Sequence, residues 1–194
     1  MTAIVLVGVL YGTLDLWRER PQAHPPGVLV PRVPDQAPLE AVIGPYERAG
    51  WKIEPVARFS VEARVLGKER YRWDSVASLS PVDLALGWGR MSDSAVLEQL
   101  EISQSARFYF YRYRSPPIAP NEITESSANM HLIPASAAIE DALAQVRRGQ
   151  LVRVSGYLVN ASHPSGGTWR SSTTRADSGA GACEIIWVTA LSVR

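Results

Sequence analysis

The chain has 194 residues, a formal net charge of +1, three histidines and one cysteine. This length is enough for one domain with a proper core. The hydrophobic fraction of 46% and the charged fraction of 20% are those of a globular protein. The near-zero charge argues against a bulk electrostatic attraction to nucleic acid or to anionic lipid. A single cysteine excludes an intrachain disulfide, and the scattered histidines offer no metal-ligand spacing, so we expect no metal and no cofactor.

Residues 1–17 form the only long apolar run of the chain, and Asp15 is its one charged side chain. As a helix this run would span roughly 25 Å, close to the hydrocarbon thickness of a bilayer of roughly 30 Å. No basic residue precedes the apolar run, and no small-residue cleavage site follows it, which argues against a secretory signal peptide. We therefore predict an uncleaved transmembrane anchor, with a cleaved signal peptide or a buried N-terminal helix as the alternatives.

Residues 18–45 are rich in proline, which fixes φ and removes a backbone donor. They predict a semi-rigid, extended stalk, in which residues 27–30 either pair locally or lie along the folded body. Arg18 and Arg20 favour a cytoplasmic body by the positive-inside rule. A short anchor followed by a stalk is, however, a common way to hold a domain outside the cytoplasm. We therefore place the body on the extracytoplasmic, periplasmic side of the membrane.

The globular body is predicted to cover residues 46–194. Apolar and polar residues alternate over residues 56–66, which indicates a half-buried strand. Ser80 and Pro81 are typical of the first residues of a helix, so we predict a helix from there to residue 86. A second short helix is predicted over residues 95–100.

Residues 107–114 read RFYFYRYR, and such aromatic residues favour a strand. Ser136 to Arg148 is the strongest helix, with a capping serine at one end and Gly149 after the other. The next predicted strand covers residues 151–159, and Gly156 within it indicates a bulge or a close backbone approach. A last strand over residues 182–193 is apolar on both faces.

These elements predict an α+β fold. Its expected architecture is a curled antiparallel sheet or a small β-barrel of the OB type, with two or three short helices. The transmembrane helix and the Pro-rich stalk precede it.

Four polar segments are not explained by strands and helices alone. Each also has a purely structural interpretation: Asp93 can cap a helix, Trp88 can pack in the core, and a lone His131 beside apolar residues is usually a structural group. As candidate binding residues we select Trp88, Arg90, Asp93, Asn129, His131, Trp169, Arg175, Asp177 and Glu184.

The alternative to a binding protein is a small hydrolase or transferase. In that interpretation Cys183 is the nucleophile, His131 is its base, and Asn129 or Asp177 orients the base. The residue types suit this chemistry, but their order and spacing match no specific signature, and cysteine is often simply buried. No catalytic residue is therefore favoured.

Arginines interleaved with aromatic residues in 107–114 also resemble a stacking platform for nucleic acid. The net charge argues against this, and we expect no nucleic acid partner. The function that the sequence favours is a membrane-anchored, non-catalytic accessory or structural subunit. Its extramembrane domain would bind and stabilise a membrane protein assembly.

Overall fold

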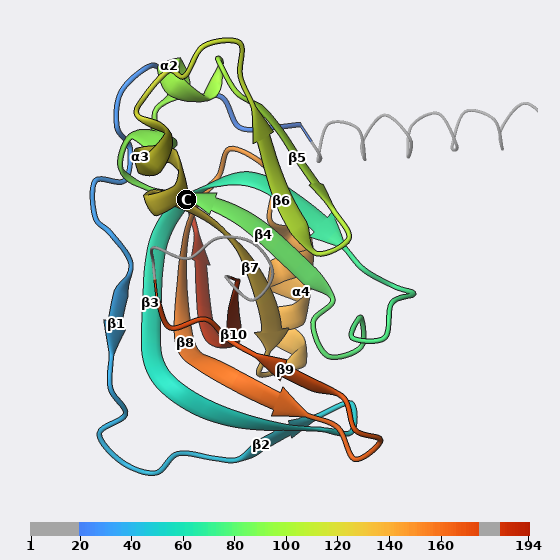
Figure 1. Ribbon diagram of the computed structural model, residues 1–194. Coiled ribbons are helices and arrows are strands. Elements are labelled where there is room, and N and C mark those ends of the chain that lie inside the picture. Colours follow the sequence, from blue (N-terminus) through green and yellow to red (C-terminus); the bar gives the residue numbers. More distant parts are fainter. Residues whose placement is uncertain (1–19, 175–182) are drawn as a thin grey trace, which may run out of the picture.

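The computed structural model describes residues 20–174 and 183–194 (Figure 1). The predicted anchor, residues 1–17, lies outside this part of the chain. Within the described part, no helix has both the length and the apolar character needed to cross a membrane.

Over the described residues, the body is mostly one large curled sheet of eight strands, combined with three short helices. The fold is therefore α+β, as predicted. The strands of this sheet are β1 (Asp35–Ala37), β2 (Tyr46–Arg48), β3 (Trp51–Arg70), β4 (Val82–Gly87), β7 (Ser127–Pro134), β8 (Leu151–Ser162), β9 (Thr168–Arg170) and β10 (Glu184–Val193).

The long strand β3 is the reason that the sheet curls. Its first part pairs with β8 and its last part pairs with β4, both antiparallel. The path of paired strands runs from β3 through β4, β7, β10 and β8 and returns to β3. One pair in this path, β7 with β10, is parallel, so the predicted antiparallel pairing is wrong there. Parallel neighbours need a long connection, and the chain between β7 and β10, which includes β8 and β9, provides it.

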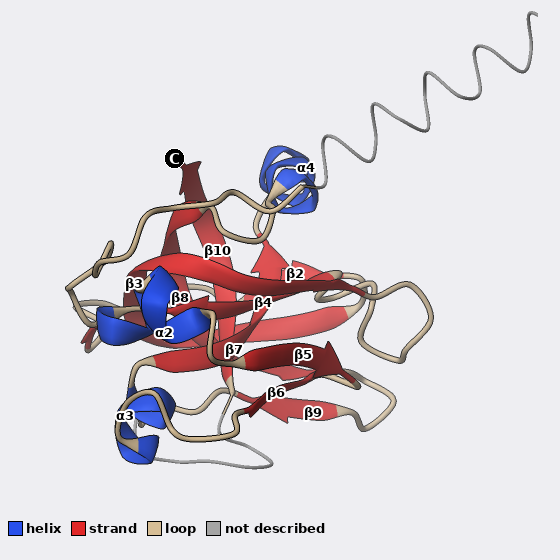
Figure 2. Cartoon of the chain, turned by 90° about the horizontal axis from the view of Figure 1, so that it is seen from above, coloured by secondary structure: helices blue, strands red, loops and turns tan. Residues whose placement is uncertain are grey.

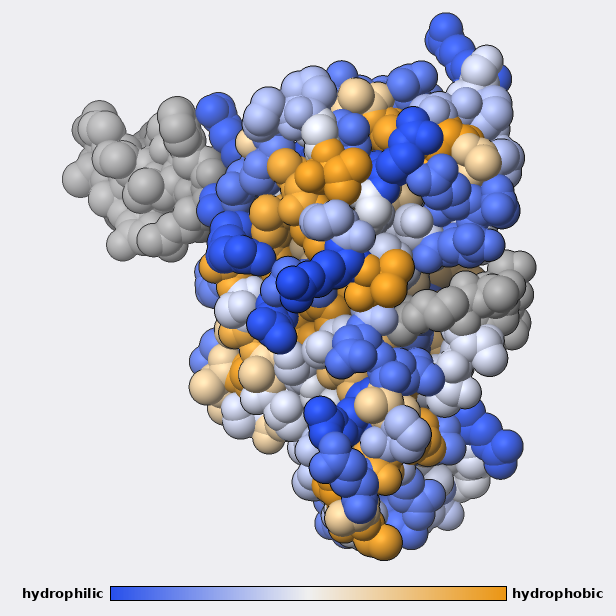
Figure 3. Space-filling model, turned by 90° about the vertical axis from the view of Figure 1, so that its left-hand side faces the viewer, coloured by the Kyte–Doolittle hydropathy of each residue, from blue (hydrophilic) through white to orange (hydrophobic). Residues whose placement is uncertain are grey.

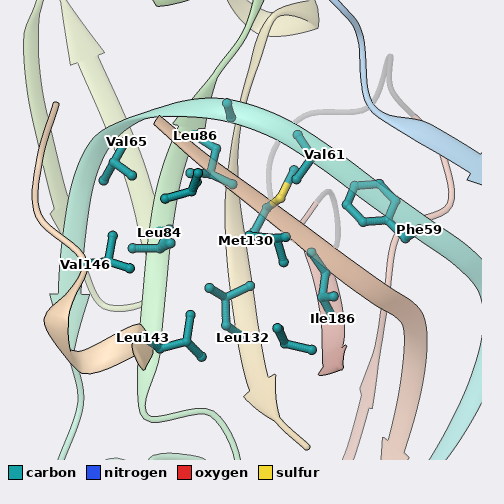
Figure 4. Packing of buried hydrophobic residues seen from close by; sticks show 14 of the residues in the cluster. Phe59, Val61, Val65, Leu84, Leu86, Met130, Leu132, Leu143, Val146 and Ile186 are labelled. Carbon is teal, nitrogen blue, oxygen red and sulfur yellow. The ribbon is translucent and has the colours of Figure 1, made fainter. Parts of the chain in front are cut away.

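The main apolar core lies inside the curl (Figure 4). From β3 it receives Phe59, Val61 and Val65, which confirms the alternation predicted for residues 56–66. Leu84 and Leu132 come from the opposite strands β4 and β7. One face of each of these three strands therefore packs toward the interior of the curl.

The helices in the described part of the chain are α2 (Ser94–Leu97), α3 (Pro120–Glu125) and α4 (Ala137–Gln145), and they lie at the periphery of the sheet (Figure 2). The hydroxyl of Ser136 accepts a hydrogen bond from the backbone N–H of Ile139, which confirms the predicted cap of α4. The helix ends earlier than predicted because Val146 leaves the helical conformation and packs into the core.

The helix predicted over residues 80–86 is wrong, because residues 82–87 form the fully buried strand β4. Asp93 accepts from the backbone N–H of Ala95 and so caps α2, close to the predicted short helix. A 3₁₀ turn, η1 (Gly89–Ser92), connects β4 with α2.

A separate hairpin of β5 (Glu101–Ser105) and β6 (Phe108–Arg112) covers the outer face of β4. Tyr109 and Tyr111 point toward the body and pack against a second apolar cluster that contains Leu66 and Ala85. Phe108 and Phe110 point away from it and are exposed. The strand predicted within residues 107–114 is therefore confirmed, and its aromatic side chains alternate between two faces.

The predicted stalk is extended, but from Gln22 to Ala37 it lies along the body (Figure 1). Val30 is buried in the main core, and its carbonyl accepts from the backbone N–H of Gly89. The strand β1 pairs with the middle of β3. On the face where this segment lies, apolar side chains gather in small groups separated by polar ones (Figure 3).

Gly156 confirms the close backbone approach that the sequence indicated. A Cβ atom at this position would lie 1.9 Å from the carbonyl oxygen of Trp187 on β10. The register between β8 and β10 also shifts next to it, between Val188 and Ala190. Only glycine allows the two strands to approach this closely.

Candidate functional site

The most concentrated group of polar side chains lies on the outer face of β4 and β7, where the hairpin turn meets the sheet. Its centre is Asp83, which is fully buried on β4. A buried carboxylate is costly unless it is paired with a charge and hydrogen-bonded. The residues around it meet this requirement.

Arg107, at the turn between β5 and β6, supplies the main pairing. Its Nη1 donates to Oδ1 of Asp83 and to the carbonyl of Ser80, both over 2.9 Å. Its Nε and Nη2 donate to the two carboxylate oxygens of Asp74, a fork-to-fork pair. The guanidinium carbon lies 3.6 Å from the centre of the Tyr71 ring, a cation–π distance.

Burial and the contacts with Arg107 shift the pKa values of two neighbouring groups. Burial raises the pKa of the Tyr71 phenol to about 12. Desolvation alone would raise the pKa of the Asp74 carboxyl, but hydrogen bonds from Arg107 and its charge outweigh it and lower that pKa. The site therefore holds Asp74 ionised and Tyr71 neutral over a wide pH range.

Asn129 links β7 to the hairpin. Its Nδ2 donates to the carbonyl oxygen of Arg107 over 2.9 Å and lies 3.4 Å from Oδ2 of Asp83. Its Oδ1 accepts from Nε2 of Gln104 on β5. The amide is thus engaged at both ends in holding the hairpin against the sheet.

His131 lies two residues further along β7, on the same face. Its Nδ1 is 2.9 Å from Oδ2 of Asp83, and its side chain is 3% exposed. Within the described residues, the Nδ1 atom makes no hydrogen bond of acceptable geometry, although it lies close to this carboxylate. Trp169 on β9 covers the imidazole, with the ring centres 4.6 Å apart.

The other candidate residues do not belong to this group. Trp88 is buried in the main core, and Arg90 lies on the surface 3.7 Å from Glu122. Asp93 caps α2 and also accepts from the backbone N–H of Gly27. Trp88 and Asp93 therefore have the structural roles that their alternative interpretation expected.

The remaining candidates lie around the start of β10. Glu184 is buried at its first residue, and Cys183 precedes it and is half-buried. The carbonyl of Cys183 accepts from the backbone N–H of Ser172. Arg175 and Asp177 lie outside the described residues.

The sequence interpretation identified Asn129, His131 and Trp169, which the fold brings together. It missed Asp83, assigned to a helix, and Arg107, assigned to a strand and otherwise considered only as part of a stacking platform for nucleic acid. The signal for Asp83 was available, because one carboxylate inside the apolar run 82–86 needs a buried partner. No sequence pattern near Asp83 identifies Arg107 as that partner.

This arrangement joins two chemically different groups, an ionic core and an aromatic cover. Within residues 20–174 and 183–194, no three histidine, cysteine, aspartate or glutamate residues converge in a way that would hold a metal ion. The polar atoms of Asp83, Asn129 and Arg107 are directed at one another. The group is therefore suited to fixing the hairpin in place.

No family model, curated protein or solved structure matches the chain.

Proposed function

We propose that this protein is a non-catalytic subunit that is held to a membrane by residues 1–17 and binds a partner protein through the outward face of the β5–β6 hairpin. The observation that carries the proposal is the exposure of Phe108 and Phe110, which are 40% and 48% exposed side by side on β6. Their ring centres are 6.3 Å apart. Adjacent exposed aromatic rings are typical of protein interfaces.

The hairpin is well suited to present these rings. Its inner face is fixed by Tyr109 and Tyr111 in the second apolar cluster and by Arg107 in the ionic group. A rigid platform loses little conformational entropy on binding, which favours affinity. The exposed rings therefore lie on a hairpin whose other face is held by buried contacts.

A hollow of about 450 Å³ adjoins the open end of the hairpin. Tyr113 provides an aromatic side chain at its border, while Glu98, Glu101, Arg112 and Arg114 contribute both signs of charge. An aromatic centre beside a polar, mixed-charge border is the usual composition of a protein interface. It suits a folded protein surface better than a polyanion.

We propose that the curled sheet is an OB-like barrel formed by β3, β4, β7, β8 and β10. The closed order of pairings and the position of α4 between β7 and β8 support this assignment. The hairpin is then an insertion between the second and third barrel strands. We also propose that the body lies on the extracytoplasmic side of the membrane.

The structure favours the binding role over the Cys183 and His131 hydrolase for one reason. A general base must reach a proton on its substrate or nucleophile. His131 is almost fully buried beneath Trp169, with Nδ1 directed toward Asp83. A catalytic role would require Trp169 to move away from the imidazole.

The test is purification of the full chain from its native membranes in a mild detergent, followed by identification of bound chains. The variant Phe108→Ser/Phe110→Ser should lose a partner that the parent chain retains. Val42→Ser, at a residue that is 98% exposed outside the hairpin, is the matched control and should retain it. A parent chain that purifies alone, or equal loss from both variants, would contradict the proposal.

A further inference from the structure

A groove of about 410 Å³ lies between the last part of β3, the strand β5 and the end of α4. Four of the side chains that line it are cationic: Lys68, Arg70, Arg147 and Arg148. Glu69 is the one acidic residue among those lining it. The chain as a whole has a net charge of only +1, so this excess of positive charge is local.

A second hollow of about 290 Å³ extends the groove, since Leu66, Ile102 and Arg148 line both. The residues that line this second hollow also include the buried Arg64 and the acidic Glu98. Burial and then the positive charge of Arg148 lower the pKa of Arg64. Two cations therefore influence each other where the hollows meet.

The start of the described chain runs beside these hollows. Residues 21–24 line the second one, and the backbone N–H of Gln22 donates to the carbonyl of Arg148 over 2.9 Å. The His24 ring is 2.8 Å from the carbonyl of Gly149. These contacts fix the point at which residues 1–19 join the body.

The length of chain between the predicted anchor and Arg148 is short. Gln22 lies five positions after Trp17, the end of the anchor, and an extended chain over five positions spans at most about 18 Å. The lipid headgroups extend roughly 5–8 Å beyond each side of the hydrocarbon core. Electrostatic attraction reaches a further ~8–10 Å at physiological salt. A bilayer that holds residues 1–17 is therefore within reach of the groove.

We propose that the cationic groove, defined by Lys68, Arg70, Arg147 and Arg148, docks on the phosphate headgroups of anionic phospholipids in the membrane that holds the anchor. The inference rests on the membrane anchor of the proposed function and not on its partner protein. It assigns an orientation to the body, because docking turns the end of β3 and of α4 toward the bilayer. The groove is at a distance from β2, which pairs with the opposite end of β3 (Figure 1).

The experiment uses the full chain in nanodiscs of phosphatidylcholine, alone or with 30% phosphatidylglycerol. A fluorescent donor is attached in a Cys183→Ser background at Gln145→Cys, beside the groove, or at Glu47→Cys in β2. Both replaced residues are exposed. Energy transfer to a headgroup acceptor should increase in anionic discs for the label at 145 and stay unchanged for the label at 47.

The charge test is the triple variant Arg70→Gln/Arg147→Gln/Arg148→Gln. Lys68 is left in place because its Nζ donates to the carbonyl of Ala144 at the end of α4. Each cation near an anionic surface changes the affinity about fivefold, so the docking equilibrium should weaken by about two orders of magnitude. The control, Arg58→Gln/Arg153→Gln/Arg170→Gln, removes the same charge from exposed positions elsewhere and should dock like the parent chain.

Each other outcome contradicts the inference in a distinguishable way. A chain that does not enter the discs would overturn the anchor and the docking together. A chain that enters but transfers energy equally in neutral and anionic discs would overturn only the docking. Loss of docking in inorganic phosphate at constant ionic strength would indicate a small-anion site. If the triple variant weakens binding of a single-stranded oligonucleotide but leaves docking unchanged, the groove binds nucleic acid.

Discussion

Arg107 and Asp83 are 24 residues apart in the chain, yet Nη1 of Arg107 donates to Oδ1 of Asp83 over 2.9 Å. The carboxylate is completely buried, and the guanidinium is mostly buried. The pair connects the turn of the β5–β6 hairpin to the second strand in the closed path of the sheet. The position of the exposed Phe108 and Phe110 therefore depends on it.

Removing the arginine should destabilise the protein strongly. Arg107→Met leaves the carboxylate of Asp83 buried without its main partner, and breaking a buried pair in this way costs about 3–5 kcal/mol. Urea unfolding measures the loss. Arg112→Met, at an exposed residue of the same hairpin, should change the free energy of unfolding by less than about 0.5 kcal/mol. Equal losses in the two variants would mean that Arg107 acts only through general hairpin packing.

Removing the charge that Arg107 neutralises should reverse part of this loss. In Arg107→Met/Asp83→Asn, the fully buried position 83 no longer holds a carboxylate, so the double variant should be more stable than Arg107→Met alone. Urea unfolding of the single and double variants gives the coupling. Strictly additive losses would contradict direct pairing of the two side chains.

Ser92 should be the main attachment of the N-terminal segment. Its hydroxyl oxygen accepts from the backbone N–H groups of Leu29 and Val30, each over 3.0 Å, and its O–H donates to the carbonyl of Gly89. Ser92→Ala leaves two N–H groups at a buried contact without an acceptor, and we expect a loss of about 1–3 kcal/mol. Hydrogen exchange should accelerate at residues 29 and 30. Ser75→Ala, at an exposed residue, should accelerate neither amide.

The alternation in residues 56–66 and the cap at Ser136 were predictable because each depends on local sequence. The strand β4 was not, because both of its faces are covered. The main core lies on one side and the hairpin on the other, so the run from Val82 to Gly87 shows no alternation. Ser80 and Pro81 then gave a misleading helix signal.

The candidate site was predictable only in part for the same reason. Asn129 and His131 share one face of a strand, and their proximity follows from the two-residue period. Their contact with Arg107 depends on where the hairpin folds back, which no local pattern specifies. The course of residues 22–37 likewise depends on acceptors such as Ser92 in the distant η1 turn.

Gly156 should be nearly irreplaceable. In Gly156→Ala the new Cβ would meet the carbonyl oxygen of Trp187, so β8 and β10 would have to separate. We expect a loss of at least about 3 kcal/mol, the upper part of the range for overpacked cores. Gly166→Ala is the control, because Gly166 also has positive φ but faces open space. It should lose only about 1 kcal/mol in thermal or urea unfolding, and a similar loss at both positions would rule out the close approach.

Tyr109 should make the stability of the protein depend on alkaline pH. Burial raises the pKa of its phenol to about 12, whereas an unfolded tyrosine ionises near pH 10. The folded state therefore favours the neutral phenol. Its contribution to stability is complete below about pH 10 and is lost as the pH rises toward 12. A shift of this size corresponds to about 2–3 kcal/mol. In urea unfolding between pH 9 and 12, Tyr109→Phe should reduce this alkaline slope, and Tyr113→Phe, outside the second apolar cluster, should keep it. An unchanged slope in Tyr109→Phe would show that the alkaline loss arises elsewhere, with Tyr71 as the next residue to replace.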